Sequence, residues 1–309
     1  MANSVLDTGT TGSFSRGTLD SKVEEGELRE RQSSSLLYMS KIGDLFDCPQ
    51  KYYWVHHWWL TPKEVPIYLT FGALIHKAIY KTGEAQDLLA GVNEIALSPL
   101  KEDEKILATF LLQRFQEKYG ALKVKRIIEQ EEVRKLPLES GFYFSNWCVK
   151  PDRVVELENG EFWVLEYKTT SGYGAGTASY YHNSVATLSY FYIMEKFFPQ
   201  VKGTKLIVLT KRGASKKEEE RCIIEDIVLS DSDKKKAESF IKYAHMFAEH
   251  IEGGRFFYKF QTRCQTPFGG ACEYLPLCFG RKSDAYFKEV VELLFNIKDP
   301  DGHLFSMED

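Results

Sequence analysis

The sequence predicts an α/β protein in which helices cover both faces of a central sheet. Two observations carry this prediction. Apolar residues recur at helical spacing in the parts of the chain before residue 120 and after residue 230, whereas between them they form short runs typical of strands. A helical stretch near 185–198 interrupts those strands. Helices that precede, separate and follow the strands favour a three-layer core.

The helical region before the strands is expected to begin near Leu36. The hydroxyl of Ser40 can cap a first helix, and Pro49 suits the first position of the next helical turn. A second helix is expected around His76, where apolar residues are spaced for one face. A third is expected at about 103–118, for the same reason.

The strands are expected at residues 126–136, 142–155, 161–168, 205–210 and 222–228. Gly160 suits a hairpin turn between the second and third of them. After the strands, a long amphipathic helix is expected to end at Gly253 and Gly254. An irregular, cysteine-bearing stretch follows, and then a short helix near 284–296.

Composition divides the chain into four parts. Residues 1–35 are rich in Ser, Thr, Gly and Glu and hold few large apolar residues, so we expect a disordered tail. The other three parts are a helical region at 36–120 with Cys48 and His76, a core at 121–254, and a cysteine-bearing segment with a helix at 255–309.

Overall composition excludes several classes of protein. With 309 residues, 43% of them hydrophobic, the chain can bury a sizeable core. A net charge of −4 weighs against indiscriminate coating of nucleic acid. The apolar runs are too short to cross a bilayer, so we expect no membrane partner. The N-terminus lacks a signal pattern, and we therefore expect a cytoplasmic protein, or the host-cell cytoplasm for a phage-encoded one.

Two acidic residues and a lysine are expected to meet at one end of the sheet. Glu166 and Lys168 flank Tyr167 on an expected strand, so their side chains must point to the same face. The turn at Gly160 brings the preceding strand alongside, which places Asp152 next to Glu166. Converging carboxylates suit Mg²⁺ or Mn²⁺, and the lysine can orient an attacking water and neutralise phosphate charge.

An ordinary amphipathic strand would show a similar alternation of charged and apolar residues. The neighbouring residues favour the catalytic interpretation, because Trp163, Val164 and Leu165 make this strand apolar enough for the centre of a sheet. Charges on a central strand need partners or a metal ion.

The Asp, Glu and Lys in this order resemble the active site of the PD-(D/E)xK nuclease superfamily, specifically its RecB-like exonuclease branch, which includes CRISPR-associated and phage-encoded members. Ser40–Tyr52 is similar to the helix-and-cysteine element of that branch, and Gly72–His76 to its Gly-x-x-x-His motif. The resemblance spans about residues 36–283. It implies a restriction-endonuclease-like core with a central mixed sheet, a helical N-terminal region and a cysteine-bearing C-terminal segment.

The resemblance also implies roles for individual residues. Asp152, Glu166 and Lys168 would be catalytic. The Mg²⁺ or Mn²⁺ ion would be held by His76, Asp152, Glu166 and Tyr167. Taken alone, His76 would more often be a satisfied core or interface histidine, and its place in the ordered set of motifs favours the metal site.

One motif of the branch is incomplete. Its members often carry Gln-x-x-x-Tyr on the helix after the lysine, where the glutamine touches the site or the substrate. Tyr190 matches the tyrosine and is a candidate substrate contact, but Ala186 stands at the glutamine position. The stretch 182–184 is a candidate replacement, or the contact is absent.

Three cysteines, Cys264, Cys272 and Cys278, lie in a stretch whose Pro and Gly residues suit an irregular metal-binding loop. In members of the branch with an iron–sulfur brace, three C-terminal cysteines and one upstream bind a [4Fe–4S] cluster, and Cys48 matches the upstream position. Seven residues separate Cys264 from Cys272, where two are common. Four thiolates also suit Zn²⁺, so a cluster, zinc and no metal all remain open.

The resemblance implies a metal-dependent DNA exonuclease of recombination, repair or phage DNA processing, acting on DNA with a free end or a single-stranded part. A restriction-type endonuclease would share the two carboxylates and the lysine. A catalytically idle DNA-end-binding or scaffold protein of the same fold is the alternative from another class, and the missing glutamine favours it weakly.

Overall fold

The computed structural model describes residues 36–64, 67–138, 143–171, 174–211, 221–252, 264, 271–279 and 283–298. The tail expected at 1–35 lies outside these segments, as do most residues between Cys264 and Cys272. Among the described helices, none is long and apolar enough to cross a membrane.

The centre of the fold is a five-stranded mixed sheet with the strand order β3-β6-β7-β8-β9. Its strands are β3 (Val124–Gln130), β6 (Arg153–Leu157), β7 (Phe162–Thr170), β8 (Val201–Thr210) and β9 (Cys222–Ile227). β7 pairs with β8 in parallel and with β6 through an antiparallel hairpin. Gly160 turns that hairpin with a φ of 82°, which a side chain would strain.

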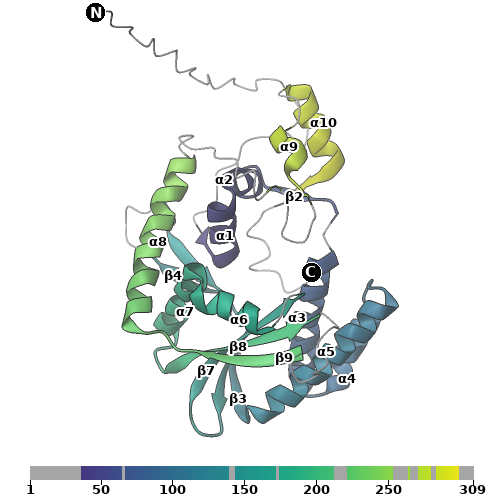
Figure 1. The fold of residues 1–309 in the computed structure, drawn as a ribbon, viewed down its shortest axis with the longest axis vertical. Coiled ribbons are helices and arrows are strands. Elements are labelled where there is room, and N and C mark those ends of the chain that lie inside the picture. The colour runs from purple at the N-terminus through teal and green to yellow at the C-terminus, as the bar shows by residue number, and fades with distance from the viewer. Residues whose placement is uncertain are drawn as a thin grey trace, which may run out of the picture.

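Helices cover both faces of this sheet, as Figure 1 shows, and the predicted α/β class is confirmed. Side chains alternate along β7, so Val164 packs toward α7 (Val185–Phe197) and α8 (Asp231–Glu252). Leu165 packs in the second core, on the opposite face. The helices of that face are α3 (Ile67–Ala85), α4 (Leu88–Ala96) and α5 (Glu102–Ala121).

Two of the predicted strands are in fact split between sheets. The strand expected at 126–136 ends at Gln130, because Glu131 adopts a left-handed φ of 54°. The chain then enters a small sheet of order β1-β5-β4. This small sheet comprises β1 (Leu36–Leu37), β4 (Arg134–Pro137) and β5 (Asn146–Val149). The strand expected at 142–155 is likewise divided into β5 and β6, with Pro151 between them.

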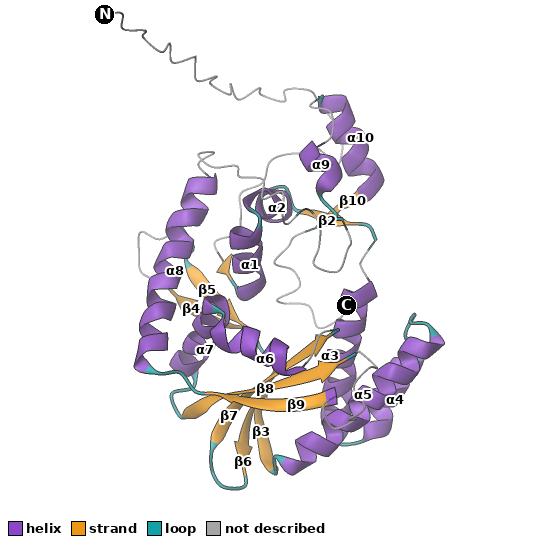
Figure 2. Cartoon of the chain, viewed as in Figure 1, coloured by secondary structure: helices purple, strands orange, loops and turns teal. Residues whose placement is uncertain are grey.

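The remaining elements lie around this core (Figure 2). They are α1 (Met39–Asp47), α2 (Pro49–Tyr52), the π-helical turn η1 (Tyr53–His57), β2 (Leu60–Pro62), α6 (Gly174–Asn183), α9 (Leu275–Phe279), α10 (Asp284–Leu294) and β10 (Phe295–Ile297). Ser40 does not cap α1, which already begins at Met39 after the extended residue Tyr38. α6 was not predicted, because its glycines disfavour a helix.

The two ends of the described chain meet at a third, smaller core. β2 pairs with β10 in antiparallel orientation. The hydroxyl of Tyr274 donates to the carbonyl of Leu60 at 2.9 Å, and both residues are buried beside Trp58 and Phe295. Segments more than two hundred residues apart are therefore joined through backbone pairing and apolar packing.

Candidate active site

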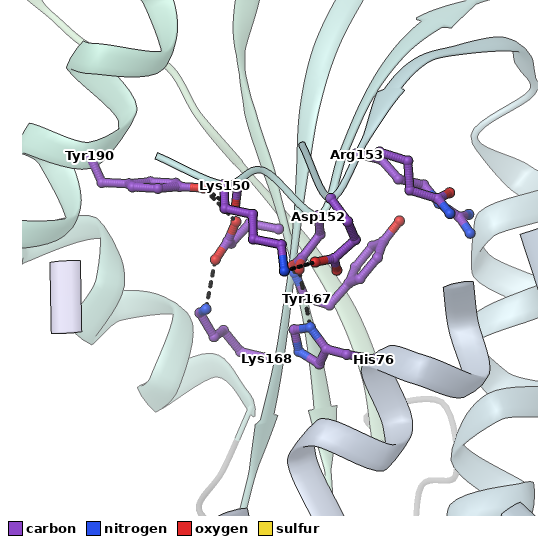
Figure 3. A network of polar contacts seen from close by, with 10 residues as sticks. His76, Lys150, Asp152, Arg153, Tyr167, Lys168 and Tyr190 are labelled. Atoms are coloured by element: carbon purple, nitrogen blue, oxygen red, sulfur yellow. Dashed lines mark hydrogen bonds and ion pairs between the residues drawn. The ribbon is translucent and has the colours of Figure 1, made fainter. Parts of the chain in front are cut away.

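Asp152 stands at the end of the central sheet, immediately before β6, with only 7% of its surface exposed. Its Oδ2 accepts a hydrogen bond from the backbone N–H of Tyr167 at 2.5 Å, so the adjacent strand β7 orients the carboxylate. Its Oδ1 lies 3.1 Å from Nδ1 of His76, which α3 supplies from the helical layer (Figure 3). The residues predicted from two separate motifs thus meet in space.

Glu166 and Lys168 project from β7 on the face that carries α6 and α7. The ammonium of Lys168 donates to Oε1 of Glu166 at 2.6 Å. The hydroxyl of Tyr190 on α7 lies 3.4 Å from the other carboxylate oxygen of Glu166 and donates to the carbonyl of Lys150 at 2.9 Å. Tyr190 therefore contacts the site directly, as Figure 3 shows.

Sequence reasoning missed a third acidic residue, Glu131. Ligand atoms of His76, Glu131 and Asp152 all lie within 4.8 Å of one another, and this is the group among the described residues that could hold a metal ion. Glu131 reaches it from the left-handed turn that ends β3, and its carboxylate is paired with Lys150 at 3.2 Å. No motif marked this residue, because it appeared to lie inside one continuous strand.

The other predicted ligands occupy different places. Glu166 is not a member of the three-residue group and is held by Lys168 instead. The ring of Tyr167 points to the opposite face of β7, where it packs against Phe115 at a centroid distance of 5.2 Å. The contact of Tyr167 with the site is its backbone N–H, which binds Asp152.

The stretch 182–184 supplies no described side-chain contact to this group. Asn183 turns back on its own helix and donates to the carbonyl of Ser179 at 2.7 Å. The side chain nearest to Lys168 from α6 is Tyr181, whose ring centre lies 5.8 Å from the ammonium. An aromatic ring thus stands on the α6 side of Lys168.

The site separates its charges in a way that suits phosphate chemistry. Burial acts to raise the pKa of Asp152, but the charge and hydrogen bond of His76 outweigh it and lower the pKa. Burial raises the pKa of Glu166 to about 7, against the attraction of Lys168 and with the repulsion of Asp152. Burial also acts to lower the pKa of Lys168, but Glu166 raises it above its usual value. At neutral pH the site therefore holds a charged lysine and an ionised Asp152.

The negative charge of Asp152 raises the pKa of both His76 and Glu131. Burial acts to lower the pKa of His76, but the charge and hydrogen bond of Asp152 raise it overall. Burial raises the pKa of Glu131, and the nearby charge of Asp152 adds to the rise. Three partly buried ligands with repelling carboxylates are an arrangement that a divalent cation would stabilise.

The four cysteines proposed as cluster ligands lie outside the central sheet. Cys48 joins α1 to α2, and Cys272 lies near enough to it for their charges to interact. The backbone N–H of Cys272 donates to the carbonyl of Cys264 at 2.9 Å, and Cys278 lies on α9. Among the described residues, no three cysteine sulfurs lie within 4.8 Å of one another.

A family model described as the PD-(D/E)XK nuclease superfamily matches residues 39–279. No curated protein matches the chain. Two solved structures are similar at low identity. The protein SSO0001 is 13% identical, with a TM-score of 0.35, over 76% of this chain and 84% of its own. A candidate exonuclease from Eubacterium rectale is 10% identical, with a TM-score of 0.44, over 72% and 83%.

Proposed function

Because this chain belongs to the PD-(D/E)XK nuclease superfamily, we propose that it is a metal-dependent DNA exonuclease of the RecB-like branch. The observation that carries the proposal is the meeting of His76, Glu131 and Asp152 within 4.8 Å, beside the Lys168–Glu166 pair. A cation-binding group next to a partly buried, charged lysine suits the hydrolysis of a phosphodiester.

The residues divide the chemistry between them. Asp152, Glu131 and His76 would hold Mg²⁺ or Mn²⁺. Glu166 would be able to approach the metal ion in its ionised form. The metal ion, when bound, would polarise the scissile phosphate and make a bound water more acidic. Lys168 supplies a fixed positive charge for a phosphate oxygen. Glu166, with a pKa of about 7, can take a proton from an attacking water at neutral pH.

A free or single-stranded DNA end suits the surface beside this site. Tyr180 on α6 exposes 68% of its surface, next to Tyr181, whose ring faces the catalytic Lys168. Exposed aromatic rings stack on unpaired bases, and each such contact contributes about 1–3 kcal/mol. Bases in an intact duplex stack on each other and offer no free face except at an end.

We also propose that Cys48, Cys264, Cys272 and Cys278 bind a [4Fe–4S] cluster. Cys48 and Cys272 come from distant parts of the chain and lie near enough for their charges to interact, and Cys272 packs beside the β2–β10 pair. Four thiolates suit a [4Fe–4S] cluster, and Zn²⁺ is the alternative. When bound, the cluster would add metal–thiolate bonds to a junction that already holds the two ends together.

A cleavage assay with Mn²⁺ or Mg²⁺ tests the enzymatic proposal. Linear DNA labelled at one end, closed circular DNA and single-stranded DNA are incubated with the full chain. The proposal predicts stepwise loss of the labelled end and an intact circle. Cleavage of the circle would support a restriction-type endonuclease, and binding without cleavage would support an idle end-binding protein.

A further inference from the structure

Arg153, directly after Asp152, is a buried cation that the chemistry above does not use. It exposes only 2% of its surface, and among the described residues no carboxylate lies within ion-pair distance of it. A buried guanidinium is costly unless its N–H groups find partners. The hydrogen-bond partners of Arg153 therefore indicate its structural role.

Those partners lie beside the other two members of the metal-binding group. Nε of Arg153 donates to Oε1 of Gln130 at 2.6 Å, and Gln130 immediately precedes Glu131. Nη2 donates to the carbonyl of Ile79 at 2.8 Å, one turn after His76 on α3. Arg153 thus follows Asp152 directly, binds the side chain of Gln130 beside Glu131, and binds the backbone of α3 one turn from His76.

The surroundings of the guanidinium are shaped to admit it. A Cβ added to Gly83 of α3 would lie 2.0 Å from Nη2 of Arg153, so only glycine leaves room there. Glycine inside a helix costs about 1 kcal/mol relative to alanine. The rings of Tyr119 and Tyr167 lie 5.4 Å and 6.0 Å from the guanidinium carbon and complete its enclosure. Figure 3 shows Arg153 on the same side of β7 as the Tyr167 ring, away from Lys168.

We propose that Arg153 is a positioning residue that sets the separation of His76, Glu131 and Asp152. It touches neither metal nor substrate, and it acts by fixing α3 and the end of β3 relative to β6. Apolar packing already holds α3 on the sheet, and the Glu131 turn is held by its backbone bond to Pro151 and by Lys150. Arg153 adds the polar link that fixes the position of the one relative to the other. Residues that orient metal ligands in this way typically change metal affinity by about 10- to 100-fold when they are replaced.

Gly83→Ala tests the proposal without removing Arg153, because the new methyl group displaces the flexible guanidinium from Ile79. Gly120→Ala is the matched control, since Gly120 also lies near a helix end and nothing lies within 4 Å of its added Cβ. Binding of Mn²⁺ to the metal-free full chain is followed by the electron paramagnetic resonance signal of free Mn²⁺. Asp152→Asn identifies the signal that belongs to this site. We expect Gly83→Ala to weaken binding at least about tenfold and Gly120→Ala to leave it unchanged.

Gln130→Leu provides a second test, because it removes the other acceptor and leaves α3 intact. We expect the same loss of affinity, with cleavage recovered at high Mn²⁺. Folded variants that both bind Mn²⁺ like the unchanged chain would overturn the proposal. Failure of both to fold, with Gly120→Ala folded, would also overturn it, because Arg153 would then support the fold and not the site.

The inference rests on the proposed metal site, but the two can fail separately. A chain that binds Mn²⁺ at Asp152 and cleaves no nucleic acid would refute the nuclease proposal and leave this one standing. Cleavage by the unchanged chain, together with unchanged Mn²⁺ affinity in Gly83→Ala and Gln130→Leu, would refute the role of Arg153 and leave the nuclease proposal standing.

Discussion

The two ends of this molecule gather chemistry-bearing side chains in different ways. At the sheet end, His76, Glu131 and Asp152 come from three separate elements and still lie within 4.8 Å of one another. At the opposite end, Cys48 and Cys272 lie near each other where apolar side chains and a two-stranded pair join distant segments. The sheet end places polar groups accurately, and the cysteine end holds the chain together.

The contrast follows from what surrounds each group. β7 is hydrogen-bonded on both sides, so the backbone N–H of Tyr167 can fix Asp152 at 2.5 Å. In the described part of the cysteine end, the strands form only the two-stranded pair of β2 and β10, and the packing is organised around Trp58, Tyr274 and Phe295. At the sheet end, the protein's own hydrogen bonds fix the positions of the site residues. At the cysteine end, a bound metal cluster would add to the stability of the junction.

The largest expected effect is at the sheet end. Asp152→Asn and Lys168→Ala should each reduce cleavage by about a thousandfold, because they remove a metal ligand and the fixed positive charge. The melting temperature of Asp152→Asn should change little, since loss of one of several neighbouring carboxylates relieves repulsion. Lys202→Ala is the control, as Lys202 pairs with Glu161 on the surface and should leave the rate unchanged. Cleavage retained by both site variants would refute the assignment.

At the cysteine end, Cys272→Ser should lower stability and leave the rate per folded molecule intact. A loss of about 2 kcal/mol would lower the Tm by about 4–8 °C. Anaerobically purified protein should contain iron and acid-labile sulfide, and the variant should lose both. Cys148→Ala is the control, because Cys148 is buried on β5, packs with Tyr38, and is not one of the proposed cluster ligands.

An iron-free sample in which Cys48, Cys264, Cys272 and Cys278 all react freely with an alkylating reagent would contradict the cluster. The prediction for the sheet end would be unaffected, since no cysteine contributes to it.

Acid should weaken the helical layer that joins the two ends. Burial lowers the pKa of His245 on α8 to about 4, and its Nδ1 accepts the backbone N–H of Phe144 at 3.2 Å. In the unfolded chain, the imidazole of His245 takes up a proton near pH 6.5. The stabilising contribution of neutral His245 is therefore complete above that pH. The contribution is lost as the pH falls toward 4 and amounts to at most about 3 kcal/mol.

His245→Gln keeps an acceptor without a titratable group. Urea unfolding of this variant should depend less on pH between 6.5 and 4 than that of the unchanged chain. Equal slopes for the two proteins would show that His245 does not carry the effect.

The smallest expected effect concerns Tyr180. Tyr180→Ala should raise KM for single-stranded DNA about tenfold, which corresponds to the loss of one base stack, and leave kcat unchanged. Tyr180→Phe keeps the ring and should behave like the unchanged chain. If KM is the same for Tyr180→Ala, Tyr180→Phe and the unchanged chain, the substrate does not bind against Tyr180 of α6.

The sequence was informative where local patterns decide the structure. The alternation around Glu166 and Lys168 and the turn at Gly160 predict a hairpin, and that hairpin forms. The helix of His76 was likewise predicted from its apolar spacing. These features depend on neighbours in the chain, so a single sequence is enough to find them.

The features that the sequence did not predict depend on contacts between distant residues. Glu131 looks like any strand residue until its left-handed φ is known. Arg153 binds the carbonyl of Ile79, seventy-four positions earlier, and no local pattern records that contact. The helix α6 forms despite its glycines, because Ala178 and its neighbours pack on the main core. Tertiary packing overrides local preference at each of these places.

Anomalous diffraction from crystals grown with Mn²⁺ would test the central claim most directly. The account predicts one Mn²⁺ peak at the end of β6, bound by the carboxylate of Asp152 with His76 and Glu131 as its neighbours, and loss of that peak in Asp152→Asn. An ordered Mn²⁺ ion elsewhere, with none at Asp152 under conditions that support cleavage, would contradict it.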